Sequence, residues 1–167
     1  KLKNILFITH VTNKLSKIKK LNISYNEVKQ YFRNINSNDI TLKNIRKKII
    51  EIRESKLPNP KILGNCGSFF KNPSIDSQSF NNLKKKYPHI VGYKNSNKIK
   101  LSAAWLIETC GWKGYKKNNV GVFKNHALVL VNYGSNNGEK ILELSEEIKI
   151  SVKEKFNIIL EKEVNIF

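Results

Sequence analysis

Aliphatic residues recur at helical spacing in residues 41–56, the first segment whose structure the pattern predicts. Their spacing of three and four places them on one face of an amphipathic helix. Asp39 or Thr41 can cap the start of this helix, and Pro58 and Pro60 stop it. The aliphatic face consists of Leu42, Ile45, Ile49 and Ile52.

A longer stripe of the same kind predicts a second amphipathic helix, over residues 137–156. Three shorter helices are predicted near residues 26–32, 77–87 and 102–110, and the last two are followed by a proline or a glycine. The stripe in the longest helix is formed by Ile141, Leu144, Ile148, Val152 and Phe156.

Short apolar runs and alternation with a period of two predict four strands. Residues 34–39 have no periodicity and predict a linker, and residues 64–73 predict a loop rich in glycine and asparagine. Strands and helices alternate irregularly, without a dinucleotide-binding glycine fingerprint or a P-loop, so the predicted fold class is α+β. The predicted strands cover residues 2–11, 98–101, 127–132 and 158–167.

The composition suits a folded domain, because 40% of the 167 residues are hydrophobic. Apolar runs are too short to cross a membrane, and we expect a cytoplasmic protein without a membrane partner. The net charge is +18, from 31 basic and 13 acidic residues, but only three of the basic residues are arginine. Lysine, asparagine and isoleucine spread along the whole chain are typical of compositional drift rather than of a nucleic-acid surface, which favours arginine. A positive field would still attract a phosphorylated small molecule.

Few side chains point to chemistry by themselves. Cys66 and Cys110, like the three histidines, lack the spacing of metal ligands, so we expect no metal site. The glycines of residues 64–68 let a ligand approach the backbone closely, but no general base is near Ser68 in sequence, and a turn explains the segment more simply. Lys113 can bind phosphate or be solvated, and Glu163 is more simply a solvent-exposed residue.

Several short motifs taken together resemble one enzyme family, the UDP-N-acetylenolpyruvoylglucosamine reductases (UDP-N-acetylmuramate dehydrogenases). The most specific block combines KLPNP with GNCGSFFKNP, and further blocks read AAWLIE, GWKG and HALVLVN, followed by a segment near the C-terminus. The resemblance extends over roughly residues 22–167. These blocks lie at residues 56–60, 64–73, 103–108, 111–114, 126–132 and 152–164.

The resemblance implies the C-terminal part of an FAD-dependent enzyme that oxidises NADPH. The reaction converts UDP-N-acetylglucosamine enolpyruvate into UDP-N-acetylmuramate for peptidoglycan synthesis. Residues 1–38 are then the tail of the FAD-binding domain. Residues 39–167 are the substrate-binding domain, a small mixed or antiparallel sheet packed by helices. FAD would be bound mainly by the preceding part of the enzyme, so we expect the isolated chain to be inactive.

The resemblance also assigns residues. Ser68 matches the serine that delivers a proton to the substrate, and Glu163 matches the second catalytic residue, which we expect to be buried and protonated. Arg53 is a further candidate, because it lies on the same helix face as Lys56. The substrate contacts implied by the match are Lys56, Asn72, Tyr93 and Lys113.

Three positions depart from the family pattern, because Phe123 and His126 stand where histidine and glutamine are expected, and Cys66 replaces a small alanine or serine. The departure at His126 puts a sugar contact in doubt. An alternative remains from another functional class, namely a non-catalytic module that binds nucleotide sugars or nucleic acid. Such a module would be descended from the same domain.

Overall fold

The computed structural model describes residues 8–18, 20–135 and 137–166, and the chain divides into two compact units, Lys1–Glu51 and Ile52–Phe167. The domain boundary predicted between residues 38 and 39 differs from the boundary between these compact units, which lies between Glu51 and Ile52. The predicted domain boundary stays a prediction. None of the helices among the described residues is both long and apolar enough to cross a membrane.

The first unit contains α1 (Asn26–Phe32), a short 3-10 helix (Ser37–Asp39) and most of α2 (Leu42–Lys56). Both predicted α-helices are confirmed. The hydroxyl of Thr41 accepts a hydrogen bond from the Asn44 amide at 3.1 Å, so Thr41 caps α2. Of the aliphatic face predicted for α2, only Ile45 is buried.

Two predictions for this unit need comment. The predicted linker contains the 3-10 helix, because the Asn36 side chain accepts a hydrogen bond from the Asn38 amide and turns the backbone. The strand predicted over residues 2–11 lies mostly outside the described residues, and residues 8–11 have no regular structure.

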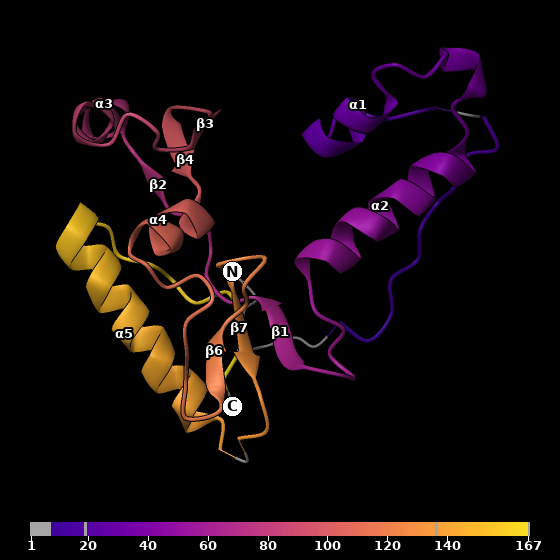
Figure 1. Ribbon diagram of the computed structural model, residues 1–167. Coiled ribbons are helices and arrows are strands. Elements are labelled where there is room, and N and C mark those ends of the chain that lie inside the picture. Colours follow the sequence, from indigo (N-terminus) through magenta and orange to yellow (C-terminus); the bar gives the residue numbers. More distant parts are fainter. Residues whose placement is uncertain (1–7, 19, 136, 167) are drawn as a thin grey trace. The chain divides into compact units, whose positions relative to one another are not determined.

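Among its described residues, the second unit contains the end of α2, two antiparallel sheets and three further helices, which confirms the α+β class (Figure 1). The larger sheet has the order β1–β7–β6–β5, and the smaller has the order β2–β4–β3. The strands are β1 (Gly64–Ser68), β2 (Ser74–Ile75), β3 (Gly92–Asn95), β4 (Lys98–Leu101), β5 (Lys116–Lys117), β6 (Val120–Val122) and β7 (Val129–Asn132).

Three helices cover these sheets, and all three were predicted. They are α3 (Ser77–Lys86), α4 (Ala103–Thr109) and α5 (Glu139–Phe156). Apolar residues recur every four positions along α5 and therefore lie on one face of the helix. This face packs on β6, β7 and α4 and forms part of the hydrophobic core. The buried members of this stripe are Leu144, Ile148, Val152 and Phe156.

The prediction of a loop over residues 64–73 is wrong for its first half, because β1 pairs with β7. The register shifts between Asn65 and Ser68, where Gly67 has a φ of 73°. A residue with positive φ is easily tolerated only as glycine, so the glycine pattern encodes an irregular strand rather than a free loop.

The strand predicted over residues 158–167 is also wrong. Residues 158–166, hereafter the C-terminal segment, form a single bridge, between Lys162 and Phe70, and no ladder. Ile158 and Leu160 are nevertheless buried, and Ile159 and Glu161 are exposed. Alternation in the sequence therefore reflects packing of an extended segment on the core, which does not require a neighbouring strand.

Candidate functional site

Ser68 ends β1 at the irregular position of the sheet. Its backbone pairs with Val129 of β7, and its side chain is half-buried. The Asn65 side chain holds the preceding turn, since its amide nitrogen donates to the carbonyl oxygens of Pro58 at 3.0 Å and Leu63 at 2.8 Å. The Asn65 side-chain oxygen accepts from the Gly67 amide at 3.1 Å. Asn65 thus sets the backbone that presents Ser68, a role that the sequence did not reveal.

Glu163 is brought beside this strand by backbone pairing. Its amide donates to the Phe69 carbonyl oxygen at 2.8 Å, one residue from Ser68, across nearly a hundred positions of sequence. The Glu163 side chain is exposed, so the burial that we expected for it is wrong for this chain. The reason is the alternation of the C-terminal segment, which turns Ile158 and Leu160 inward and Glu163 outward.

Neither the Ser68 hydroxyl nor the Glu163 carboxylate makes a hydrogen bond or ion pair within the described part of the chain. Both groups can therefore contact a ligand without first breaking an internal interaction. Their closeness along the backbone makes them candidates for one shared site.

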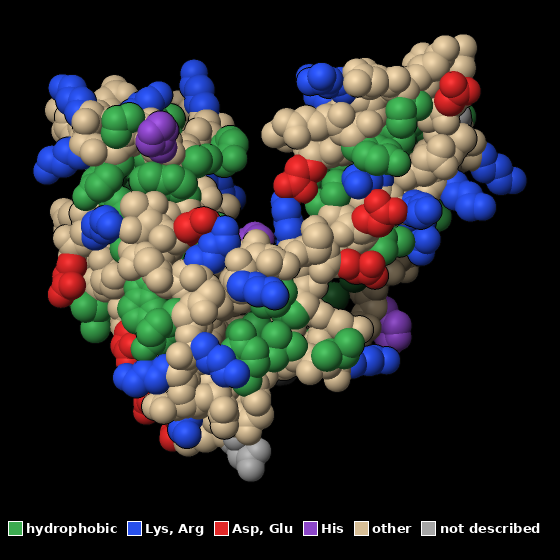
Figure 2. All heavy atoms as spheres, viewed as in Figure 1, with side chains coloured by type: hydrophobic (Ala, Val, Ile, Leu, Met, Phe, Trp, Pro, Cys, Tyr) green, Lys and Arg blue, Asp and Glu red, His purple; other side chains and the backbone are tan. Residues whose placement is uncertain are grey.

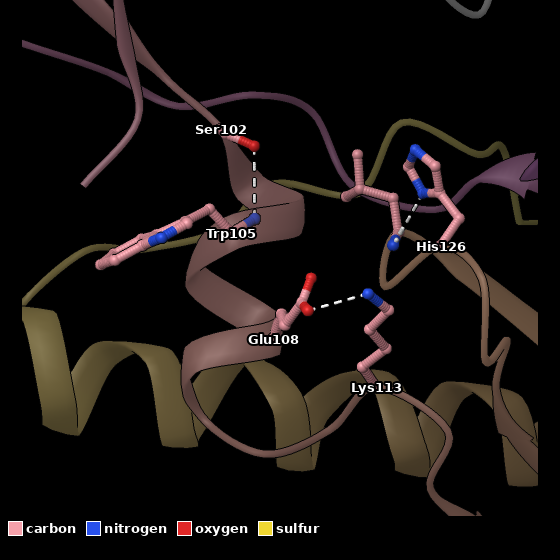
Figure 3. Close-up of polar contacts among 6 residues, drawn as sticks. Ser102, Trp105, Glu108, Lys113 and His126 are labelled. Atoms are coloured by element: carbon pink, nitrogen blue, oxygen red, sulfur yellow. Dashed lines mark hydrogen bonds and ion pairs between the residues drawn. The ribbon is translucent and has the colours of Figure 1, made fainter. Parts of the chain in front are cut away.

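A group of charged side chains lies where α4 meets the loop between β6 and β7 (Figure 3). The Lys113 ammonium and the Glu108 carboxylate point toward one another and form an ion pair, 2.8 Å from Nζ to Oε1. His126 lies on the neighbouring loop, where its Nδ1 accepts a hydrogen bond from the Leu128 amide at 3.2 Å. This bond requires Nδ1 to be unprotonated, so Nε2 carries the proton of the neutral ring and can donate it.

The surroundings of His126 lower the pKa of its ring. Burial lowers the pKa most, because it disfavours the charged ring, and the ammonium groups of Lys56 and Lys113 lower it further. The Glu108 carboxylate acts in the opposite direction. Lys56 ends α2 and Lys113 follows α4, so the fold brings two of the predicted substrate contacts to one histidine.

The end of α2 is held against the same loop. The Asn125 side-chain nitrogen donates to the Ser55 carbonyl oxygen at 3.0 Å, next to Lys56. Arg53, one turn earlier, is exposed and lines an open hollow of about 540 Å³ together with Leu57, Pro58 and Asn65. Arg53 and Lys56 thus belong to the same helix end, as predicted, but Arg53 is not among the charges that shift the pKa of His126.

Asn72 and Tyr93, the other two predicted substrate contacts, are not among the groups that act on His126. The Asn72 side-chain oxygen accepts a hydrogen bond from the Ala103 amide at 2.9 Å, which satisfies a free N–H in the first turn of α4. Its side-chain nitrogen makes no hydrogen bond to the part of the chain that the structure describes and can therefore bind a ligand. Tyr93 is 64% exposed on β3, opposite Lys100 in the smaller sheet. The structure thus gives Asn72 a structural role that the sequence did not predict.

Basic side chains elsewhere form no single patch on the face shown in Figure 2, where lysine and arginine are scattered over both units. Among the described residues, no group of three or more histidine, cysteine, aspartate or glutamate side chains could hold a metal ion. The fold and the site thus define an α+β domain with converging lysines suited to an anionic ligand.

Comparison with known proteins gives the family. The family described as "UDP-N-acetylenolpyruvoylglucosamine reductase, C-terminal domain" matches residues 58–167. The reductase of Flavobacterium johnsoniae is 45% identical over 166 residues, which cover 98% of this chain and 49% of that protein. The reductase of Pseudomonas savastanoi pv. phaseolicola is 41% identical over 96% of this chain and 48% of its own length. The reductase of Porphyromonas gingivalis is 48% identical over 74% of this chain and 37% of its own length.

The chain therefore belongs to the UDP-N-acetylenolpyruvoylglucosamine reductase family and contains its C-terminal domain. It spans about half the length of the first two of these relatives, or less in the third. The sequence motifs had indicated the same family and the same part of it.

Proposed function

We propose that this chain is the substrate-binding part of a cytoplasmic flavoenzyme that reduces UDP-N-acetylglucosamine enolpyruvate to UDP-N-acetylmuramate at the expense of NADPH. The observation that carries the proposal is the hydrogen bond from the Glu163 amide to the Phe69 carbonyl oxygen, which brings Glu163 next to Ser68. The ammonium groups of Lys56 and Lys113 both act on His126, in the loop that leads into β7. Family membership supports it, because the relatives carry the name of this reductase.

FAD, reduced by NADPH, would supply the hydride. We assign no residue of this chain to FAD, which would be held mainly by the half of the relatives that lies outside the match. The part played by this chain is to bind the nucleotide sugar, orient the enolpyruvyl double bond and deliver a proton.

Ser68 would donate that proton. Hydride reaches one carbon of the double bond and the Ser68 hydroxyl protonates the other, which yields the saturated product. A serine hydroxyl is a poor acid, so this transfer requires a strongly basic acceptor held in place. Glu163 would act at the enolpyruvyl carboxylate, and it must be protonated there because two carboxylates would repel each other. Its exposure in this chain leaves room for the substrate or another domain to cover it.

Lys56 and Lys113 would bind the diphosphate as point charges. The diphosphate would compete with Glu108 for the Lys113 ammonium. Neutral His126 can donate from Nε2 to a ligand oxygen without the desolvation cost that a charged ring would have at this partly buried position. Arg53, Asn72 and Tyr93 would extend the contacts along the nucleotide sugar. In the 167-residue chain alone we expect weak binding and no reduction.

The proposed role of Ser68 is tested by Ser68→Ala in the complete flavoprotein, followed by stopped-flow flavin absorbance. Reduction of the flavin by NADPH should keep its rate, and reoxidation by UDP-N-acetylglucosamine enolpyruvate should slow by about 100-fold or more, the usual contribution of a positioned acid. The reason is that only reoxidation requires a proton on the substrate carbon.

Ser77→Ala, which changes an exposed serine at the start of α3, is the matched control and should leave both rates unchanged. Equal slowing of both half-reactions by Ser68→Ala would refute the role of Ser68. A wild-type protein that binds generic RNA at physiological salt but not the UDP-sugar would instead support the alternative module, because non-specific lysine contacts weaken steeply with salt.

A further inference from the structure

The C-terminal segment that carries Glu163 has little backbone pairing to hold it. Within the described residues it forms one bridge, between Lys162 and Phe70, flanked by hydrogen bonds from the Glu163 amide to the Phe69 carbonyl oxygen and from the Lys71 amide to the Glu161 carbonyl oxygen. A full strand would have a ladder to set its position along its length. Side chains must therefore contribute to the position of this segment.

Two ion pairs join consecutive residues of the segment to different elements. The Lys71 ammonium, just after β1, lies 3.0 Å from Oε2 of Glu161. The Lys162 ammonium lies 2.7 Å from Oε1 of Glu146, on α5. The segment is thus linked to the loop after β1 on one side and to α5 on the other, immediately before Glu163.

The second ion pair is the shorter and the less exposed of the two. The side chains of Lys162 and Glu146 are 26% and 45% exposed, against 49% and 72% for Lys71 and Glu161. Hydrogen bonds from Lys149 and Lys162 lower the pKa of Glu146, so its carboxylate stays charged below the usual pH range. Lys149 bonds the other oxygen, Oε2, at 2.7 Å and lies on the same helix, three residues along. The two lysines thus bind different oxygens of the Glu146 carboxylate, and only Lys162 belongs to the C-terminal segment.

We propose that Glu146 and Lys162 are positioning residues, which hold the C-terminal segment against α5 so that Glu163 lies beside Ser68. This inference rests on the proposed function, because it concerns the alignment of the two catalytic candidates. Exposed ion pairs contribute little to global stability. A small displacement of a catalytic group, in contrast, can slow the chemical step greatly. Loss of the pair should therefore affect the rate much more than the fold.

The experiment uses Lys162→Ala in the complete flavoprotein, with UDP-N-acetylglucosamine enolpyruvate as the probe. At saturating probe, flavin reoxidation should slow at least fivefold, while the dissociation constant of the probe and the rate of reduction by NADPH stay unchanged. Glu146→Gln, which keeps the shape of the side chain and removes its charge, should slow reoxidation similarly. Lys162→Arg should restore most of the rate, because it keeps the cation.

Lys149→Ala is the matched control. It removes an ion pair of equal length from the same carboxylate, but it leaves the link to the C-terminal segment intact. Its reoxidation rate should be within twofold of wild type. A merely structural role for Lys162 would make the two alanine variants alike, or would slow both half-reactions together, and either result would overturn the inference.

The outcomes also separate this inference from the proposed function. A wild-type protein whose reduced flavin is not reoxidised by the probe contradicts the proposed function, and the inference fails with it. A wild-type protein that reacts normally, with Lys162→Ala and Glu146→Gln equally fast, contradicts the positioning role alone.

Discussion

At the residue scale, neighbouring groups shift the pKa of the His126 ring in opposite directions. Burial and the ammonium groups of Lys56 and Lys113 lower its pKa, and the Glu108 carboxylate raises it. The pKa of His126 in the folded chain lies below the ordinary value of 6.5. As the pH falls below 6.5, the unfolded chain therefore binds more protons at this ring than the folded chain does. The stability that depends on neutral His126 is therefore complete above about pH 6.5 and is lost progressively at lower pH, down to the folded pKa.

Single substitutions should move this pKa in opposite directions. Lys113→Ala removes a repelling cation and should raise the pKa of His126, whereas Glu108→Gln removes an attracting anion and should lower it. Titration of the His126 ring signals by NMR measures both shifts. Lys116→Ala, which removes a lysine that instead lies 4.1 Å from the centroid of the Tyr133 ring, should leave the value unchanged. Shifts of the same sign in the first two variants would contradict this account of the charge cluster.

At the element scale, α5 is the helix on which the core is built. Its buried stripe packs on the larger sheet and α4, and its outer face is exposed. The helix ends at Asn157, which adopts a left-handed conformation with a φ of 55° and donates its amide to the Lys153 carbonyl oxygen at 2.8 Å. Asparagine is among the few residues that tolerate this conformation, and the turn directs Ile158 into the core.

The two faces of α5 predict very different costs for the same substitution. Ile148 is 0% exposed and Ile150 is 56% exposed. Ile148→Ala should lower the free energy of unfolding by about 2–5 kcal/mol, because it removes buried methyl groups and leaves a cavity. Ile150→Ala should change it by less than about 0.5 kcal/mol. Urea denaturation followed by circular dichroism measures both, and similar costs at the two positions would show that the helix packs differently.

At the scale of the whole molecule, the main hydrophobic core belongs to one of the two units. Every member of the core cluster, including the partly buried residues packed against it, lies between Phe69 and Val164. The buried residues of the first unit form a separate set, Val28, Phe32, Ile40 and Ile45. Because burial of apolar area is the dominant stabilising contribution, the second unit has what it needs to fold by itself.

Residues 52–167 should therefore unfold cooperatively when expressed alone. We expect a melting temperature within roughly 5 °C of that of the 167-residue chain, since the core is unchanged. Differential scanning calorimetry of both chains is the measurement. Residues 52–156 are the matched control and should lose the cooperative transition, because this truncation removes the buried Ile158 and Leu160. A broad, non-cooperative transition for residues 52–167 would mean that the first unit is needed for folding.

The sequence by itself determined the helices and the family. Residues 26–32, 77–87, 102–110 and 137–156 were predicted as helices because a helix is made by local hydrogen bonds and a stripe that repeats within a few residues. The motifs around Ser68 indicated the family, which the comparisons confirm.

Only the tertiary structure decided which strands pair and which distant side chains come together. The pairing of β1 and β7, the single bridge of Lys162 and the exposure of Glu163 depend on partners far away in the chain, which alternation cannot name. The same holds for the meeting of Lys56 and Lys113 at His126, because three separate elements supply these side chains. The roles of Asn65 and Asn72 in holding loop and helix were likewise invisible without the structure.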